Sequence, residues 1–94
     1  MKPSSKPYQI RISGTAATAI EKASEKDRNL IKEAFRIISL DPFDHAHVRK
    51  LKGEWEGRFR IRKGGWRIIF RPPEDDVVYA VYVRMRLENT YRTR

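Results

Sequence analysis

The 94-residue sequence contains no cysteine, only two histidines and no long apolar run. The absence of cysteine excludes disulfides, thiolate zinc sites and a cysteine nucleophile. The longest strongly apolar run is 77–83, whereas a membrane-spanning helix needs about 20 residues. Residues 1–7 are polar and have no apolar core behind their lysines, so they indicate a disordered lead and not a signal peptide. We therefore expect a soluble, cytoplasmic protein with a single domain over residues 8–94.

Positive charge is what the sequence has in excess, with 21 Lys and Arg against 12 Asp and Glu. Residues 49–94 hold 13 of these basic side chains and six of the acidic ones, and most of the 13 are arginine. The planar guanidinium binds phosphate with two hydrogen bonds and stacks on bases. This surplus indicates a polyanionic partner, either nucleic acid or an acidic protein, and a well-solvated surface is the alternative.

The hydrophobic pattern of the first half predicts a strand followed by two helices. Apolar residues alternate over 8–13, as they do in a half-buried strand. Helical spacing follows over 16–23 and resumes after Ser24, which can cap a second helix. Pro42 ends that helix, because the residue before a proline avoids helical geometry. Residues 41–52 show no clear period, and we predict a loop there.

The second half predicts three strands joined by short turns, at 58–62, 66–71 and 77–84. Gly64 and Gly65 form a hairpin signal between the first two, because glycine supplies the positive φ that such turns need. Three strands with short connections form an antiparallel meander. The predicted fold class is therefore an α+β two-layer sandwich, in which both helices cover one face of the sheet and the other face is partly open.

Three arginines alternate along the first strand of this meander, and they therefore project to the open face: Arg58, Arg60 and Arg62. Alternate residues of a strand lie about 6.6–6.8 Å apart, a spacing comparable with that of phosphates along a nucleic acid. Arg67 on the next strand joins the same face if the hairpin register allows it. Like charges side by side repel each other, so we interpret the row as a phosphate-binding surface and not as a solvated face.

Other candidate groups give weaker signals. Trp66 shares a face with Ile68 and is expected in the core, whereas Trp55 stands between two glutamates and has no clear role. Tyr91 lies in a polar tail without a packing reason and is the best candidate for stacking on a base. His45 and its neighbour two positions on lack a carboxylate set that would complete a metal site, so we expect no metal and no cofactor.

The segment from Leu51 to Phe70, followed by the valine-rich run 77–83, Arg86 and Tyr91, resembles the RelE/ParE toxin superfamily. The shared pattern is leucine-lysine-glycine, a basic strand, a glycine turn, an aromatic residue with arginine, a valine strand, an arginine and a tyrosine. The resemblance implies the toxin of a type II toxin–antitoxin pair, held in a hetero-oligomer by an acidic antitoxin. RelE-like members cut messenger RNA on the ribosome, and ParE-like members inhibit DNA gyrase.

The resemblance also implies roles for individual residues. Arg67 corresponds to the arginine that stabilises the scissile phosphate, Arg86 to the arginine after the last strand, and Tyr91 to the tyrosine that stacks on a base. The RNA-binding residues that it implies are Lys52, Arg58, Arg60 and Arg62. Met85 stands where many relatives have histidine.

The sequence identifies no general base. Arginine holds its proton up to a pKa of about 12.5–13.8, so it cannot readily accept one. The candidates that remain open are Lys52, Lys63, Tyr91, Glu54 and Glu56, and positioning by the ribosome is a further alternative. A ribosome-dependent mRNA endonuclease is favoured. A non-catalytic gyrase inhibitor or a basic module that binds only its antitoxin is the second hypothesis, and the missing histidine and base favour it.

Overall fold

The helices and strands follow the predicted order, with one additional strand and one additional short helix. In the computed structural model the elements are β1 (Gln9–Ile12), α1 (Gly14–Lys22), α2 (Glu25–Leu40), β2 (Val48–Lys50), the 3₁₀ helix η1 (Gly53–Trp55), β3 (Phe59–Lys63), β4 (Trp66–Phe70) and β5 (Val77–Met85). The structure describes residues 7–85. Residues 1–6 of the predicted lead therefore lie outside the described residues. Arg86 and Tyr91 also lie outside them.

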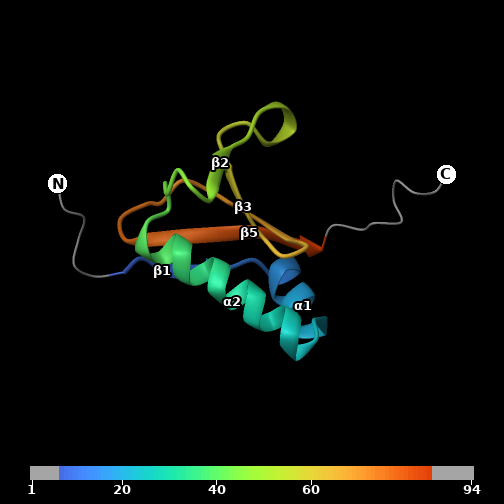
Figure 1. The fold of residues 1–94 in the computed structure, drawn as a ribbon. Helices are drawn as coiled ribbons and strands as arrows, with labels where there is room; N and C mark the ends of the chain where they lie inside the picture. Colours follow the sequence, from blue (N-terminus) through green and yellow to red (C-terminus); the bar gives the residue numbers. More distant parts are fainter. Residues whose placement is uncertain (1–6, 86–94) are drawn as a thin grey trace.

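The five strands form one mixed sheet in the order β1-β5-β4-β3-β2 (Figure 1). β3, β4 and β5 are antiparallel neighbours, so the predicted meander is confirmed. β1 pairs with β5 in parallel, with Ile10 opposite Val78. The chain between these two strands, residues 13–76, contains both helices and the other three strands, so it is much longer than the crossover that a parallel pair requires. Neither helix is long and apolar enough to span a membrane, within the part of the chain that the structure describes.

The loop predicted for residues 41–52 is wrong in its last part, where β2 forms. Val48 lies opposite Ile61 of β3 and is only 8% exposed. A strand of three residues with a single buried side chain produces no alternating pattern, so its pairing cannot be read from the local sequence. The backbone N–H groups of Phe43 and Ala46 donate to aspartate side chains in the preceding turn, and these bonds order the approach to β2.

Serine caps begin both helices. The side-chain oxygen of Ser13 accepts a hydrogen bond from the Ala16 N–H, and that of Ser24 accepts one from the Asp27 N–H. Ser13 also donates from its hydroxyl to the carbonyl of Val81 on β5, which ties the start of α1 to the sheet. These caps satisfy N–H groups that the helices leave unpaired at their first turn.

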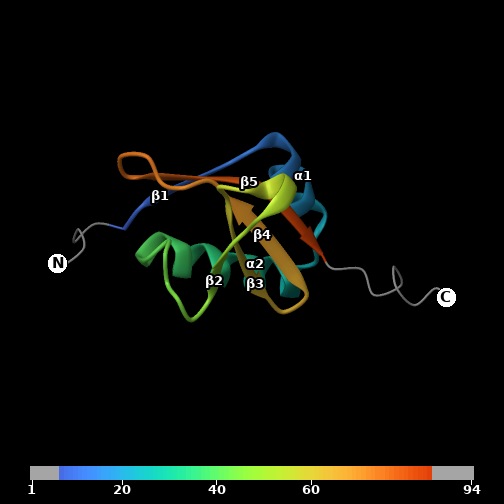
Figure 2. The same ribbon diagram turned by 90° about the horizontal axis from the view of Figure 1, so that it is seen from above.

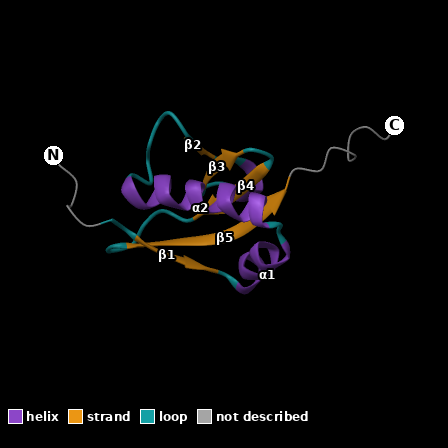
Figure 3. Cartoon of the chain, turned by 60° about the horizontal axis from the view of Figure 1, so that its bottom comes forward, coloured by secondary structure: helices purple, strands orange, loops and turns teal. Residues whose placement is uncertain are grey.

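Both helices pack on the same face of the sheet, and the hydrophobic core lies between the two layers (Figure 3). Helix α2 contributes Ile31, Ala34 and Ile38, all essentially buried. The sheet contributes Phe70, whose ring stacks on Phe59 with centroids 5.9 Å apart. Trp66, predicted in the core, is 7% exposed. The two-layer α+β sandwich expected from the sequence is thus confirmed.

The β3–β4 turn provides a test of the hairpin geometry. Gly64 has φ +60°, and a Cβ added there would lie 2.7 Å from Cδ1 of Leu30 on α2. We expect Gly64→Ala to lower the free energy of unfolding by about 1 kcal/mol, because alanine is strained at this positive φ and the Leu30 side chain must also move. Gly65→Ala is the matched control, because a Cβ there makes only ordinary contact with Met85. Equal urea midpoints for the two variants would contradict this account.

Candidate nucleic-acid interface

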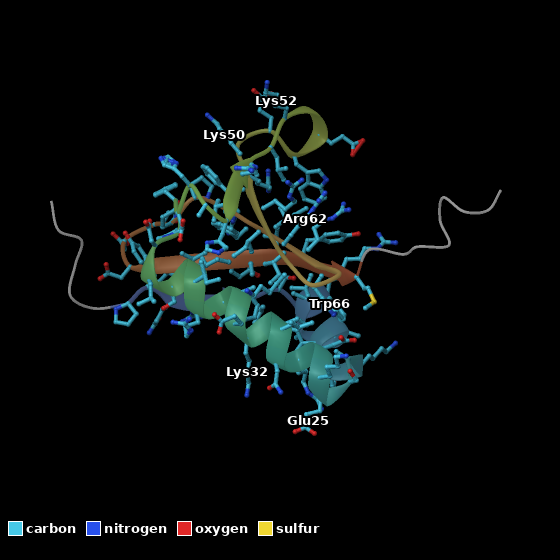
Figure 4. The ribbon with its side chains drawn as sticks, in the orientation of Figure 1. Glu25, Lys32, Lys50, Lys52, Arg62 and Trp66 are labelled. Atoms are coloured by element: carbon cyan, nitrogen blue, oxygen red, sulfur yellow. The ribbon has the colours of Figure 1, made fainter. Side chains whose placement is uncertain are left out.

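The sheet face opposite the helices carries a row of three arginines that crosses three strands. Arg62 of β3 lies opposite Arg67 of β4, and Arg67 lies opposite Arg84 of β5. Directly opposed residues in antiparallel strands have their Cβ atoms about 4.5–5.5 Å apart. We call Arg62, Arg67 and Arg84 the arginine row, and the sheet face that carries it the arginine face. Figure 4 shows Arg62 on the side away from the helices, whereas Trp66 points toward them.

More arginines surround this row on the same face. Arg60 follows the same alternation as Arg62, and it lies opposite Arg49 of β2. Arg58 precedes β3 in the same alternation, so the three arginines predicted from the sequence share one face. The hairpin register pairs Arg67 with Arg62 and so brings Arg67 to this face. The sequence predicted this position only if the register allowed it.

The arginines on this face have no acidic partner among residues 7–85. The ion pairs in that range join Arg36 to Glu33 and His47 to Asp44, both away from the arginine row. The Nε atoms of Arg58 and Arg60 are buried without a hydrogen-bond partner. Such a concentration of like charge destabilises the isolated domain and favours binding of an anion.

The electrostatic effect is clearest at Arg60. Partial burial lowers the pKa of its guanidinium, and the positive charges of Arg62, Arg67 and Arg49 lower the pKa further, in that order. Each of these causes opposes the charged form of Arg60. A bound phosphate would reverse the Coulombic part, because negative charge stabilises all four guanidinium groups.

The loop around η1 folds over part of this face, which is therefore less open than expected. The ring centroids of Trp55 and Tyr82 are 5.5 Å apart, and the Arg58 guanidinium lies 5.9 Å from the centroid of the Trp55 ring. Figure 2, viewed from above, shows this loop across the strands. Ile69 shares the arginine face by register with Tyr82, yet it is only 3% exposed. Trp55, for which the sequence indicated no clear role, thus packs against Tyr82 and Arg58.

The structure separates some of the predicted residues from the arginine row. Lys52 is exposed beside η1 and lies near Lys50, apart from Arg62 (Figure 4). Lys63, a candidate base, lies opposite Trp66 and therefore on the helix-covered face. Glu54 is exposed and forms no ion pair within the described residues. The roles implied for Arg86 and Tyr91 lie outside the described residues.

The two histidines are exposed and belong to the turn before β2. The Nδ1 atom of His47 lies 3.2 Å from the Asp44 carboxylate, which also accepts a hydrogen bond from the Ala46 N–H. The backbone hydrogen bond, followed by the contact with His47, lowers the pKa of Asp44. No group of three or more potential metal ligands gathers within the described ranges. The contact with Asp44 gives His47 a local role in this turn.

Two cationic residues next to Arg60 and Arg67 on this face could not be placed from the sequence pattern. Arg49 was assigned to a loop, and β2 places it beside Arg60. Arg84 was assigned only to the last strand, and its position depends on a β-bulge between Ile69 and Phe70. Without the bulge, counting back from the pair Phe70 and Ala80 would put Arg84 opposite Trp66, on the helix-covered face. No signal in the sequence indicates the bulge.

The chain is thus a small α+β protein whose sheet face away from the helices carries arginines without an acidic partner among residues 7–85. No protein-family model and no curated protein matches the chain. Solved structures do match. The RelBE2 toxin–antitoxin complex of Mycobacterium tuberculosis is 26% identical, with a TM-score of 0.73, over 85% of this chain and 99% of that one. The isolated RelE toxin of E. coli is 18% identical, with a TM-score of 0.72, over 92% of each chain.

The archaeal RelE–RelB complex of Pyrococcus horikoshii is a further match, 22% identical over 87% of this chain and 98% of that one, with a TM-score of 0.70. The likenesses extend over nearly the full length of the matched chains. The chain therefore has the fold of the RelE and RelBE toxin structures that it matches.

Proposed function

We propose that this protein is the toxin of a type II toxin–antitoxin pair and that it cuts messenger RNA on the ribosome, in the cytoplasm. The observation that carries the proposal is the arginine row, which faces away from the helices and has no acidic partner among residues 7–85. Fixed positive charge on one sheet face suits the phosphate backbone of an RNA strand.

The chemistry needs three things from the site. Attack of the ribose 2′-hydroxyl requires removal of its proton, stabilisation of the charged phosphorane and protonation of the leaving oxygen. In our proposal Arg67, in the middle of the arginine row, stabilises the phosphorane. Arg86 adds charge at the same phosphate, and Tyr91 stacks on a neighbouring base. Arg58 and Arg60 bind the flanking backbone.

Proton removal is assigned to no described residue. The arginines hold their protons too strongly to act as a base, and Lys63 faces the helices. We propose that the protein contributes mainly electrostatic stabilisation and that the ribosome orients the RNA for in-line attack. This division of work fits a site rich in guanidinium groups.

A single induction experiment distinguishes mRNA cleavage from gyrase inhibition. After induction of the toxin in growing bacteria, we expect a rapid loss of protein synthesis together with cleaved messages, while plasmid supercoiling stays unchanged. Arg67→Ala, expressed at an equal level, controls for the burden of expression. Loss of supercoiling with intact messages would overturn the proposal and assign a ParE-like activity instead.

The antitoxin gives a second, independent prediction. We propose an acidic antitoxin whose carboxylates replace RNA phosphates on the arginine face. Charges at the rim of an interface accelerate association, so the on-rate should fall clearly between about 50 and 500 mM salt. Stopped-flow association of the purified pair measures it. An on-rate independent of salt would show that the antitoxin binds an apolar surface and leaves the arginines to RNA.

A further inference from the structure

Arg84 is held in place by an aromatic contact at the β5 end of the arginine row. Its Nη1 donates a hydrogen bond to the Tyr82 hydroxyl oxygen, and its guanidinium lies 5.9 Å from the centroid of the same ring. Tyr82 in turn packs against Trp55 of η1. Tyr82 is half-buried, whereas Arg84 is exposed. A flexible side chain is thus restrained by a fixed aromatic support while its other N–H groups face solvent.

Such restraint matters for binding because an arginine loses side-chain entropy when it is ordered by a ligand. That loss offsets part of the affinity that the new contacts would otherwise give. A guanidinium already ordered by Tyr82 avoids part of this cost. The hydrogen bond uses one of five N–H donors, so the remaining fork can still reach a phosphate.

The arginine row also runs in a defined direction, across the strands of the sheet from β3 to β5. Neighbouring strands lie about 4.7–4.9 Å apart, so three opposed residues extend about 10 Å across the sheet. This length accommodates two successive phosphates of a single strand. Arg58, Arg60 and Arg62 run along β3 instead, at a right angle to the row, and both directions meet at Arg62.

We propose that Arg84 is a further phosphate-binding residue, that Tyr82 is its positioning residue, and that the RNA strand crosses β3, β4 and β5 along the arginine row. This inference rests on the proposed function and names the path of its substrate. The strand would then leave the sheet at Arg84, two residues before Arg86 in the sequence.

The opposite end of the same face offers a matched control. The Arg71 guanidinium lies 4.7 Å from the centroid of the Tyr79 ring, also on β5. Arg71 is exposed, like Arg84. It follows Arg67 by four residues, or about 13 Å along the strand. Arg71→Ala and Tyr79→Phe therefore make the same chemical changes as Arg84→Ala and Tyr82→Phe, away from the arginine row.

The test measures binding of a fluorescent, mixed-sequence single-stranded RNA of about a dozen nucleotides at several salt concentrations. We expect Arg84→Ala to weaken binding at least about tenfold and to reduce the salt slope by about 0.7, as for one lost phosphate contact. Arg84→Lys should restore the slope. Tyr82→Phe should weaken binding about three- to fivefold with an unchanged slope, because the charge remains. The two control variants should bind within about twofold of wild type.

The outcomes separate the two proposals. If Arg84→Ala binds like wild type while Arg67→Ala loses affinity, the path across the sheet is wrong and the proposed function stands. If Arg84→Ala and Arg71→Ala lose affinity equally, only overall charge matters, and the inference fails. If wild type and Arg67→Ala bind the RNA equally, the arginine row is not the surface that binds free RNA, and the inference fails, whereas cleavage on the ribosome is judged separately by the induction experiment.

Discussion

Replacement of Arg67 by alanine is expected to abolish growth arrest while the protein stays folded. Arg67 occupies the centre of the arginine row, between Arg62 and Arg84, and makes no ion pair within residues 7–85. Removal of one charge-assisted contact to a reacting phosphate costs about 2–4 kcal/mol of transition-state stabilisation, or about 10²–10³ in rate. The measurement is the growth rate after induction, with protein levels matched by immunoblot.

Arg71→Ala serves as the control for Arg67→Ala, because it removes the same charge from the same face at a site outside the arginine row. Thermal unfolding of both purified variants checks that neither loses its fold. We expect Arg71→Ala to arrest growth like wild type. A folded Arg67→Ala protein that still arrests growth fully would show that the phosphate-binding centre lies elsewhere.

The largest effect on stability is expected for Phe70→Ala. Phe70 is fully buried between the sheet and α2, and its ring stacks on Phe59. Loss of a buried phenylalanine ring costs about 3–5 kcal/mol, since transfer energy is lost and a cavity remains. A domain of this size has only about 5–14 kcal/mol in total, so the variant should be close to unfolding at 37 °C.

Urea denaturation of Phe70→Ala, compared with Phe35→Ala, tests this packing. Phe35 lies on α2 and is only partly buried against the core, so its replacement should cost clearly less. A larger loss for Phe35→Ala than for Phe70→Ala would contradict the packing of the two layers. The toxicity of both variants should fall with their folded fraction and not with any change at the arginine row.

Local signals in the sequence predict most of the fold. The stripe that includes Ile31, Ala34 and Ile38 has helical spacing, and these residues bury the face of α2 that packs on the sheet. Ser24 and Pro42 bracket that helix as expected. The glycines at 64–65 form the predicted hairpin turn. Each of these features depends on residues near one another in the chain, so short-range physical rules suffice.

Features that depend on distant pairing could not be predicted. β2 forms because Val48 pairs with Ile61, which follows it in the chain after a connection that includes η1. The bulge between Ile69 and Phe70 rotates the β5 residues that follow Ala80, and it thereby brings Arg84 to the arginine face. A shift of one residue moves every side chain to the opposite face, so the register decides which arginines meet. The position of Arg67 could therefore be predicted only on the condition of a suitable register, and the position of Arg84 could not be predicted.

Cleavage of messenger RNA in a reconstituted translation system tests the central claim most directly. Purified protein is added to ribosomes programmed with a defined message, and primer extension maps any new ends. We predict cuts inside the translated message that require ribosomes, that Arg67→Ala abolishes and that Arg71→Ala retains. An intact message in the presence of folded, growth-arresting protein would contradict the claim.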